Sequence, residues 1–146
     1  MLDLMSWNRA GDQQGRERQC RRQRRHHDRR DALARTADVF LVGGLPEGLA
    51  RQGIDFDSIV KINPRIVHCN LTGYGPDTED ANRAAYDVGA FYSRGGVAAG
   101  LTAPGQEPPL QRGGMGDHMT GSSAAGAIAA ALFHRERTGA GQRVAV

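Results

Sequence analysis

Short apolar runs alternate with polar, glycine-containing segments from Ala37 onward, and this alternation predicts the order of elements. The runs 38–42 and 65–72 are apolar and rich in β-branched residues, and each ends at a glycine-containing turn. Such runs are typical of buried parallel strands. Residues 142–146 begin a third run of the same kind. We therefore expect three strands.

Helices are predicted between these strands by their start and stop residues. Pro46 suits the first turn of a helix that Gly53 would end. Asp55 can cap a second helix over 56–62, which stops before a proline. A further helix is expected over 85–92.

The longest predicted helix runs through the alanine-rich stretch that follows Asp117. Asp117 or Thr120 is expected to cap its amino end. Two arginines, Arg135 and Arg137, suit the negative end of the helix, and Gly139 is expected to terminate it.

Strands that alternate with helices predict an α/β fold with a parallel sheet and flanking helices. The polar segment 77–84 and the proline- and glycine-containing segment 102–114 are expected to be loops.

Charge divides the 146-residue chain into two segments, 1–36 and 37–146. The first holds ten arginines against five acidic residues, a net charge of +5, and has no helical or strand periodicity. The second carries a net charge of −2, so the overall +3 comes from the first 36 residues alone. Nucleic-acid binding would therefore rest entirely on the first segment.

Two interpretations of residues 1–36 compete. The segment could be a basic arm that binds nucleic acid or acidic lipid. It could also be a GC-rich coding region read in the wrong frame, which yields arginine-rich sequence without pattern. We favour the second, because the change at Ala37 is abrupt, and we expect no nucleic-acid partner.

Candidate chemistry concentrates in the glycine-rich run 113–121, which places Asp117 among glycines just before the long helix. Glycines let the backbone approach a ligand closely, and a helix start favours negative charge. A reachable carboxylate of this kind can act as a nucleophile. Helix capping is the commoner role of such an aspartate, and the neighbouring His118 is more often a packing residue than a base.

The remaining composition excludes several classes of function. Cys20 and Cys69 have neither metal-site nor disulfide-framework spacing, so a reducing cytoplasm and no metal are expected. The apolar run 124–133 is too short to span a bilayer. The amino terminus lacks the apolar core of a signal peptide, and no membrane association is expected.

Several motifs, taken in order along the chain, resemble the class III CoA-transferases, the family of formyl-CoA transferase, carnitine CoA-transferase and the α-methylacyl-CoA racemases. Each motif is unspecific alone, but their order is specific. They are 37–40, 49–55, 62–67, Thr72-Gly73-Tyr74-Gly75, Tyr86-Asp87, Gly116-Asp117 and 135–142.

The resemblance implies an enzyme that moves CoA between an acyl-CoA and a free carboxylic acid, with CoA as substrate and no permanently bound cofactor. The aspartate at the position of Asp117 would attack the thioester and form a mixed anhydride, then an aspartyl-CoA thioester. In the family, the segment matching 43–52 lines the CoA cleft. The residues implicated are Asp117 as nucleophile; Gly116, His118 and Tyr74 beside the substrate; and Gly48, Arg51 and Gln52 as CoA contacts.

Two positions depart from the family pattern. Many members have Asn where this chain has Gly43, which weakens one expected CoA contact. The racemase branch has an acid/base His where this chain has Tyr86, so an acyl-CoA racemase or epimerase is the alternative rather than the first choice.

The resemblance also implies a longer protein, because family members have a larger Rossmann-like domain and a second domain. We expect residues 37–146 to be a partial large domain preceded by the atypical segment 1–36. Full-length relatives form intertwined homodimers. We expect the 146-residue chain by itself to be inactive.

Overall fold

The computed structural model describes residues 18–20 and 26–146. The chain divides into two compact units, Met1–Thr36 and Ala37–Val146. In the first unit residues 26–36 form a helix, although the sequence shows no helical periodicity there. The predictions made for positions 1–17 and 21–25 lie outside the described residues.

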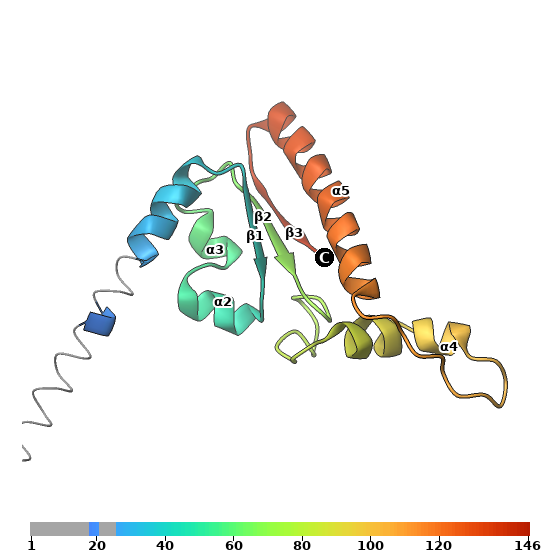
Figure 1. The fold of residues 1–146 in the computed structure, drawn as a ribbon. Helices are drawn as coiled ribbons and strands as arrows, with labels where there is room; N and C mark the ends of the chain where they lie inside the picture. The colour runs from blue at the N-terminus through green and yellow to red at the C-terminus, as the bar shows by residue number, and fades with distance from the viewer. Residues whose placement is uncertain (1–17, 21–25) are drawn as a thin grey trace, which may run out of the picture. The chain divides into compact units, whose positions relative to one another are not determined.

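The second unit is built on three parallel strands in the order β1-β2-β3 (Figure 1). They are β1 (Val39–Gly43), β2 (Val67–Leu71) and β3 (Gln142–Ala145). All three match the apolar runs of the sequence, so the expected α/β fold with a parallel sheet is confirmed. The central strand β2 is buried over four of its five residues.

Helix α5 (Met115–Thr138) packs on one face of this sheet through small side chains. Ala124 and Ala131 lie against Val67, Cys69 and Val144, and all five are buried. Because alanine carries no bulk beyond Cβ, the helix backbone approaches the strands closely.

The opposite face of β2 contributes His68, since neighbouring side chains on a strand point to opposite faces. His68 is 2% exposed, stacks on Phe40 with ring centroids 5.4 Å apart, and meets the edge of Phe56. Its Nε2 lies 2.9 Å from the carbonyl oxygen of Ile54. His68 is thus a buried packing residue.

Two short helices connect β1 to β2 (Figure 1). Helix α2 (Pro46–Gln52) begins at Pro46 and ends at Gly53, which has a left-handed φ of 63°, as predicted. Helix α3 (Phe56–Ile59) is shorter than the expected 56–62, and Asp55 precedes it without a side-chain capping bond. The three residues that follow α3 form turns instead.

The segment after β2 differs from the expected α-helix. Residues Val88–Arg94 form a π-helix, η1, whose end is closed by the N–H of Gly95 donating to the carbonyl of Ala90 at 2.8 Å. A side chain at Gly95 would collide with the carbonyl oxygen of Phe91, so glycine permits this wide turn. Helix α4 (Val97–Leu101), which the sequence did not indicate, follows, and the loop over 102–114 agrees with expectation.

The amino end of α5 also corrects a prediction. Its cap is Gly114, at a left-handed φ of 80°, and neither Asp117 nor Thr120 caps it. The left-handed glycine ends the loop and starts the helix earlier, so Asp117 lies inside the first turn. The carboxyl end agrees with expectation, because Gly139 terminates the helix at a φ of 78°.

Arg135 connects the far end of α5 to the starts of two strands. Its side chain is 10% exposed, and its Nη2 lies 2.9 Å from the Asp38 carboxylate. Its Nη1 donates to the backbone carbonyls of Asp38 and Arg65 at 3.4 Å. Asp38 itself is 75% exposed. The contribution of this cluster to stability therefore comes mainly from the buried arginine and its bonds to the two carbonyls.

We predict that Arg135→Ala lowers the free energy of unfolding by about 2 kcal/mol, because two carbonyls lose a donor and a buried stem is removed. Asp38→Asn should lower it by less than about 1 kcal/mol, since an exposed ion pair contributes little. Urea unfolding of both variants measures the difference. Equal losses would contradict this account of Arg135.

Burial raises the pKa of the Cys69 thiol, and Cys69 is 0% exposed whereas Cys20 is exposed. The thiolate is the form that alkylating reagents attack. We predict that iodoacetamide at neutral pH modifies Cys20 at least about a hundredfold faster than Cys69. Mass spectrometry of timed samples measures both rates, and in urea the two rates should converge.

Candidate active site at the amino end of helix α5

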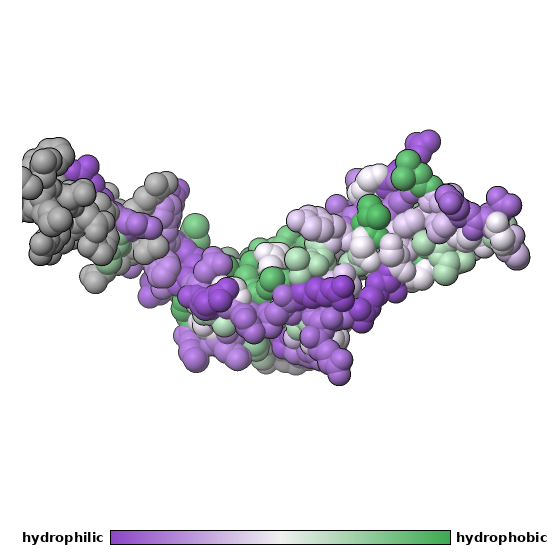
Figure 2. Space-filling model, turned by 90° about the horizontal axis from the view of Figure 1, so that it is seen from below, coloured by the Kyte–Doolittle hydropathy of each residue, from purple (hydrophilic) through white to green (hydrophobic). Residues whose placement is uncertain are grey.

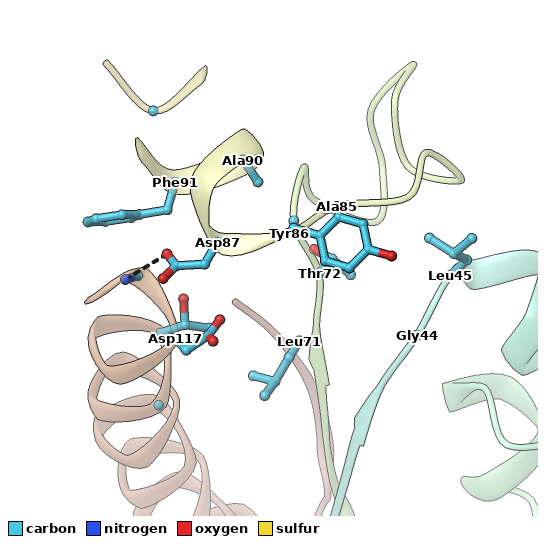
Figure 3. Close-up of a pocket in the computed structure, with 15 residues that line it drawn as sticks. Gly44, Leu45, Leu71, Thr72, Ala85, Tyr86, Asp87, Ala90, Phe91 and Asp117 are labelled. Carbon is cyan, nitrogen blue, oxygen red and sulfur yellow. Dashed lines mark hydrogen bonds between the residues drawn. The ribbon is translucent and has the colours of Figure 1, made fainter. Parts of the chain in front are cut away.

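A cavity of about 640 Å³ opens where the carboxyl ends of β1 and β2 meet the amino end of α5 (Figure 3). The strands contribute residues at and just after their carboxyl ends, among them Gly44 and Thr72. Helix α5 contributes its first two turns. In parallel α/β sheets this edge is where ligands usually bind.

Asp117 lines this cavity from the first turn of α5, with its side chain exposed. Figure 3 shows it near Asp87 and Leu71. Within the described part of the chain, no hydrogen bond or ion pair involves the Asp117 carboxylate. The helix amino end favours its negative charge. The arrangement offers an unbonded carboxylate to whatever enters the cavity.

Gly116, the other residue of the predicted motif, is buried and lines the same cavity. Its N–H donates to Oδ1 of Asp87 at 2.8 Å, a bond drawn in Figure 3. A Cβ at this position would lie 2.5 Å from Cβ of Phe91 and would also collide with Asp87. Only glycine fits here.

Asp87 is a cavity residue to which the sequence analysis assigned no role. It precedes η1 and lines the cavity, and its Oδ2 is buried without a hydrogen-bond partner. The only sequence signal was its place in the Tyr86-Asp87 motif. A contact with Gly116, 29 residues later, has no periodic signature.

His118 turns away from this site. Its Nδ1 makes a short contact with the carbonyl oxygen of Gly114, and its side chain is not part of the cavity wall. A role for His118 beside the substrate therefore remains a prediction without support from the cavity geometry.

Tyr74 lies in a second cavity of about 530 Å³ that shares Gly73 and two other residues with the first. The guanidinium carbons of Arg83 and Arg94 lie 5.9 and 5.4 Å from its ring centroid, within cation–π range. Arg94 also pairs with Asp80 at 2.6 Å. Tyr74 is therefore adjacent to the site rather than part of its wall.

The three predicted CoA contacts, Gly48, Arg51 and Gln52, lie on α2 and line neither cavity. The residues that precede α2, Gly44 and Leu45, do line the first cavity. Helix α2 thus leads away from the site, with Arg51 exposed in its last turn.

Among residues 18–20 and 26–146, no three His, Cys, Asp or Glu side chains gather where they could bind a metal ion. None of the helices in the same ranges has the length and apolarity needed to cross a membrane.

Comparison with known proteins adds to this geometry. The family model of CoA-transferase family III matches residues 23–146, so the match begins upstream of Ala37. The chain is 36% identical over 110 residues to the cinnamoyl-CoA:phenyllactate CoA-transferase of Clostridium sporogenes, covering 75% of the chain and 27% of that relative. It is 40% identical over 115 residues to the formyl-CoA:oxalate CoA-transferase of Streptomyces avermitilis, covering 78% of the chain and 27% of that relative.

One solved structure is similar to this chain in both sequence and fold over the aligned part. The crystal structure of a CAIB/BAIF family protein from Brucella suis superposes with a TM-score of 0.71 at 36% identity. The superposition covers 78% of this chain and 30% of that one. The chain therefore spans roughly a quarter to a third of the proteins it matches.

We predict that Gly116→Ala destabilises the protein by about 1–3 kcal/mol, because the added methyl group overpacks against Phe91 and displaces Asp87. Gly126→Ala in the same helix is the matched control, since a Cβ there meets nothing within 4 Å. That variant should gain up to about 1 kcal/mol of helix propensity. Thermal unfolding followed by circular dichroism measures both, and shifts of the same sign would contradict the close contact.

Proposed function

Because this chain belongs to CoA-transferase family III, we propose that the carboxylate of Asp117 is the nucleophile that transfers coenzyme A from an acyl-CoA to a free carboxylic acid. One observation carries the proposal: Asp117 presents an unbonded carboxylate to a cavity at the ligand-binding edge of the sheet. Covalent catalysis by a carboxylate requires a group that is reachable and oriented.

The proposed reaction consists of four acyl transfers. The Asp117 carboxylate attacks the thioester carbonyl, forming a mixed anhydride and expelling CoA thiolate. The thiolate attacks the aspartyl carbonyl, giving an aspartyl-CoA thioester and releasing the donor acid. The acceptor carboxylate then attacks this thioester, forming a second anhydride and expelling the thiolate again. The thiolate finally attacks the acceptor acyl carbonyl, which yields the new acyl-CoA and regenerates the Asp117 carboxylate.

The cavity lies at the start of helix α5, and this position supports each attack. Oxyanions develop at the carbonyl oxygens during these transfers. The amino end of α5 offers N–H groups and a partial positive charge to such oxyanions. Gly44, Gly73 and Gly116 line the cavity, and an added Cβ at each would meet a neighbouring side chain, so these glycines allow the segments around the cavity to pack closely.

Helix α2 is proposed as the element that holds the nucleotide end of CoA, through Gly48, Arg51 and Gln52. The exposure of Arg51 supports this role, since a guanidinium can donate two parallel hydrogen bonds to a phosphate. His118 and Tyr74 are proposed as neighbours of the substrate.

Transfer is preferred to racemisation because Tyr86, rather than histidine, lines the cavity next to Asp87. A phenol is a weak base at neutral pH. Solvent deuterium should therefore not enter the α-carbon of the acyl group during turnover.

We propose that the full-length protein acts as a homodimer in the cytoplasm. Apolar side chains are exposed over α4 and the loop that follows it, on the right of Figure 2. Leu101 is 58% and Leu110 98% exposed. Burial of these side chains by a second copy would remove this apolar surface from water.

We predict that Asp117→Ala in the full-length protein lowers the rate of CoA transfer at least about a thousandfold, because the covalent intermediate cannot form. Asp57→Ala is the matched control: Asp57 also lies exposed in the first turn of a helix, α3, and does not line the cavity. It should leave the rate within about twofold.

The assay follows the exchange of labelled CoA between the donor–acceptor pairs named for the two relatives, formyl-CoA with oxalate and cinnamoyl-CoA with phenyllactate. Mass spectrometry of the protein quenched during turnover should show an adduct on the peptide that contains Asp117. Transfer by Asp117→Ala, or an adduct on another residue, would refute the proposal.

A further inference from the structure

We propose that Asp87 is a positioning residue that keeps the Asp117 carboxylate free for attack by occupying the start of α5 itself. The inference rests on the proposed function, because it concerns how Asp117 is held. Asp87 does not touch the reacting atoms in this account; it acts through Gly116 and the helix.

The contact is well defined in the structure. Oδ1 of Asp87 accepts the N–H of Gly116 at 2.8 Å, and Oδ2 is buried without any hydrogen-bond partner. Asp87 is half-buried as a residue, and a carboxylate with one buried, unpaired oxygen and a single hydrogen bond is stabilised by a further favourable field. The amino end of α5, a helix of 24 residues, supplies that field.

Asp117 competes for the same helix start. A carboxylate in the first turn is attracted to the unpaired backbone N–H groups and the partial positive charge of the helix start. Here the N–H of Gly116 already donates to Asp87. A second carboxylate at this site is also repelled by the first. This agrees with the structure, in which the Asp117 carboxylate makes no hydrogen bond to any described residue.

Gly116 links the two carboxylates, because it bonds to Asp87 and directly precedes Asp117. A methyl group on Gly116 would collide with Oδ1 of Asp87 and lie 2.5 Å from Cβ of Phe91. Asp87 and Phe91 therefore meet the helix at its backbone, with no side chain between them. Through this direct contact Asp87 fixes the position of the first turn of α5. Asp117 is the residue after Gly116 in that turn.

The kinetic test compares two substitutions in the full-length protein. In Asp87→Ala the N–H of Gly116 is freed, Asp117 can bond to its own helix, and kcat should fall at least about tenfold with KM for acyl-CoA within about twofold. Asp87→Asn keeps an acceptor oxygen for Gly116, so kcat should stay within about threefold of the parent. Asp77→Ala, which removes an exposed aspartate that pairs with Arg143 away from the cavity, is the control and should change neither constant.

A merely structural role for Asp87 makes a different prediction. It would reduce the folded fraction in proportion to the loss of thermal stability, with kcat per folded molecule unchanged. An unchanged kcat in folded Asp87→Ala overturns the proposal. A fall of equal size in Asp87→Asn also overturns it, because the asparagine retains the acceptor.

The second readout is independent of turnover and uses the 146-residue chain. In nuclear magnetic resonance spectra, Asp87→Ala should shift the Gly116 amide and the Asp117 side-chain carboxyl carbon, whereas Asp87→Asn should leave Gly116 protected from hydrogen exchange. If neither signal moves in Asp87→Ala, the positioning role is refuted even where transfer is observed. If the parent protein transfers no CoA while both signals move, the proposed function fails and the Asp87 contact stands.

Discussion

The packing of α5 against β2 and β3 is the interaction on which the site depends. Ala124 and Ala131 let the helix backbone lie close to Val67, Cys69 and Val144, so the helix axis is fixed relative to the sheet. A 24-residue helix is a stiff rod. Arg135 fixes its far end to the strand starts, and its amino end lies over the strand carboxyl ends. Asp117, 18 residues before Arg135, lies about 27 Å from it along the axis at 1.5 Å per residue.

The parts of the fold that the sequence predicted are those governed by local rules. Apolar runs marked the three strands, and Pro46 and Gly53 marked the limits of α2, because each acts through its own backbone. The predicted start of α5 was wrong, because Gly114 adopts a left-handed conformation that capping preferences do not reveal. The π-helix η1 was likewise missed, because its wide turn depends on the carbonyl of Phe91 meeting Gly95.

The same distinction between local rules and contacts formed on folding applies to the candidate site. Asp117 and Gly116 were identified because glycines around a carboxylate are visible in the sequence, and both line the cavity. Asp87 was not assigned a role, because its contact with Gly116 arises only when η1 and α5 are brought together. Tyr74 was placed beside the substrate by the family resemblance and His118 by its position next to Asp117. The Tyr74 side chain lies in a second cavity instead, and that of His118 contacts the Gly114 carbonyl.

The π-helix has a consequence for how such a site can change through evolution. A π-turn holds one residue more than an α-turn, so the gain or loss of one residue in such a segment can be accommodated by a change between the two kinds of turn. An insertion at η1 rotates Phe91 and the residues beyond it about the helix axis while β1, β2 and β3 keep their register. Homologous sequences could thus acquire differently shaped cavities by gaining or losing one codon between Asp87 and Gly95, without any change in the sheet that supports them.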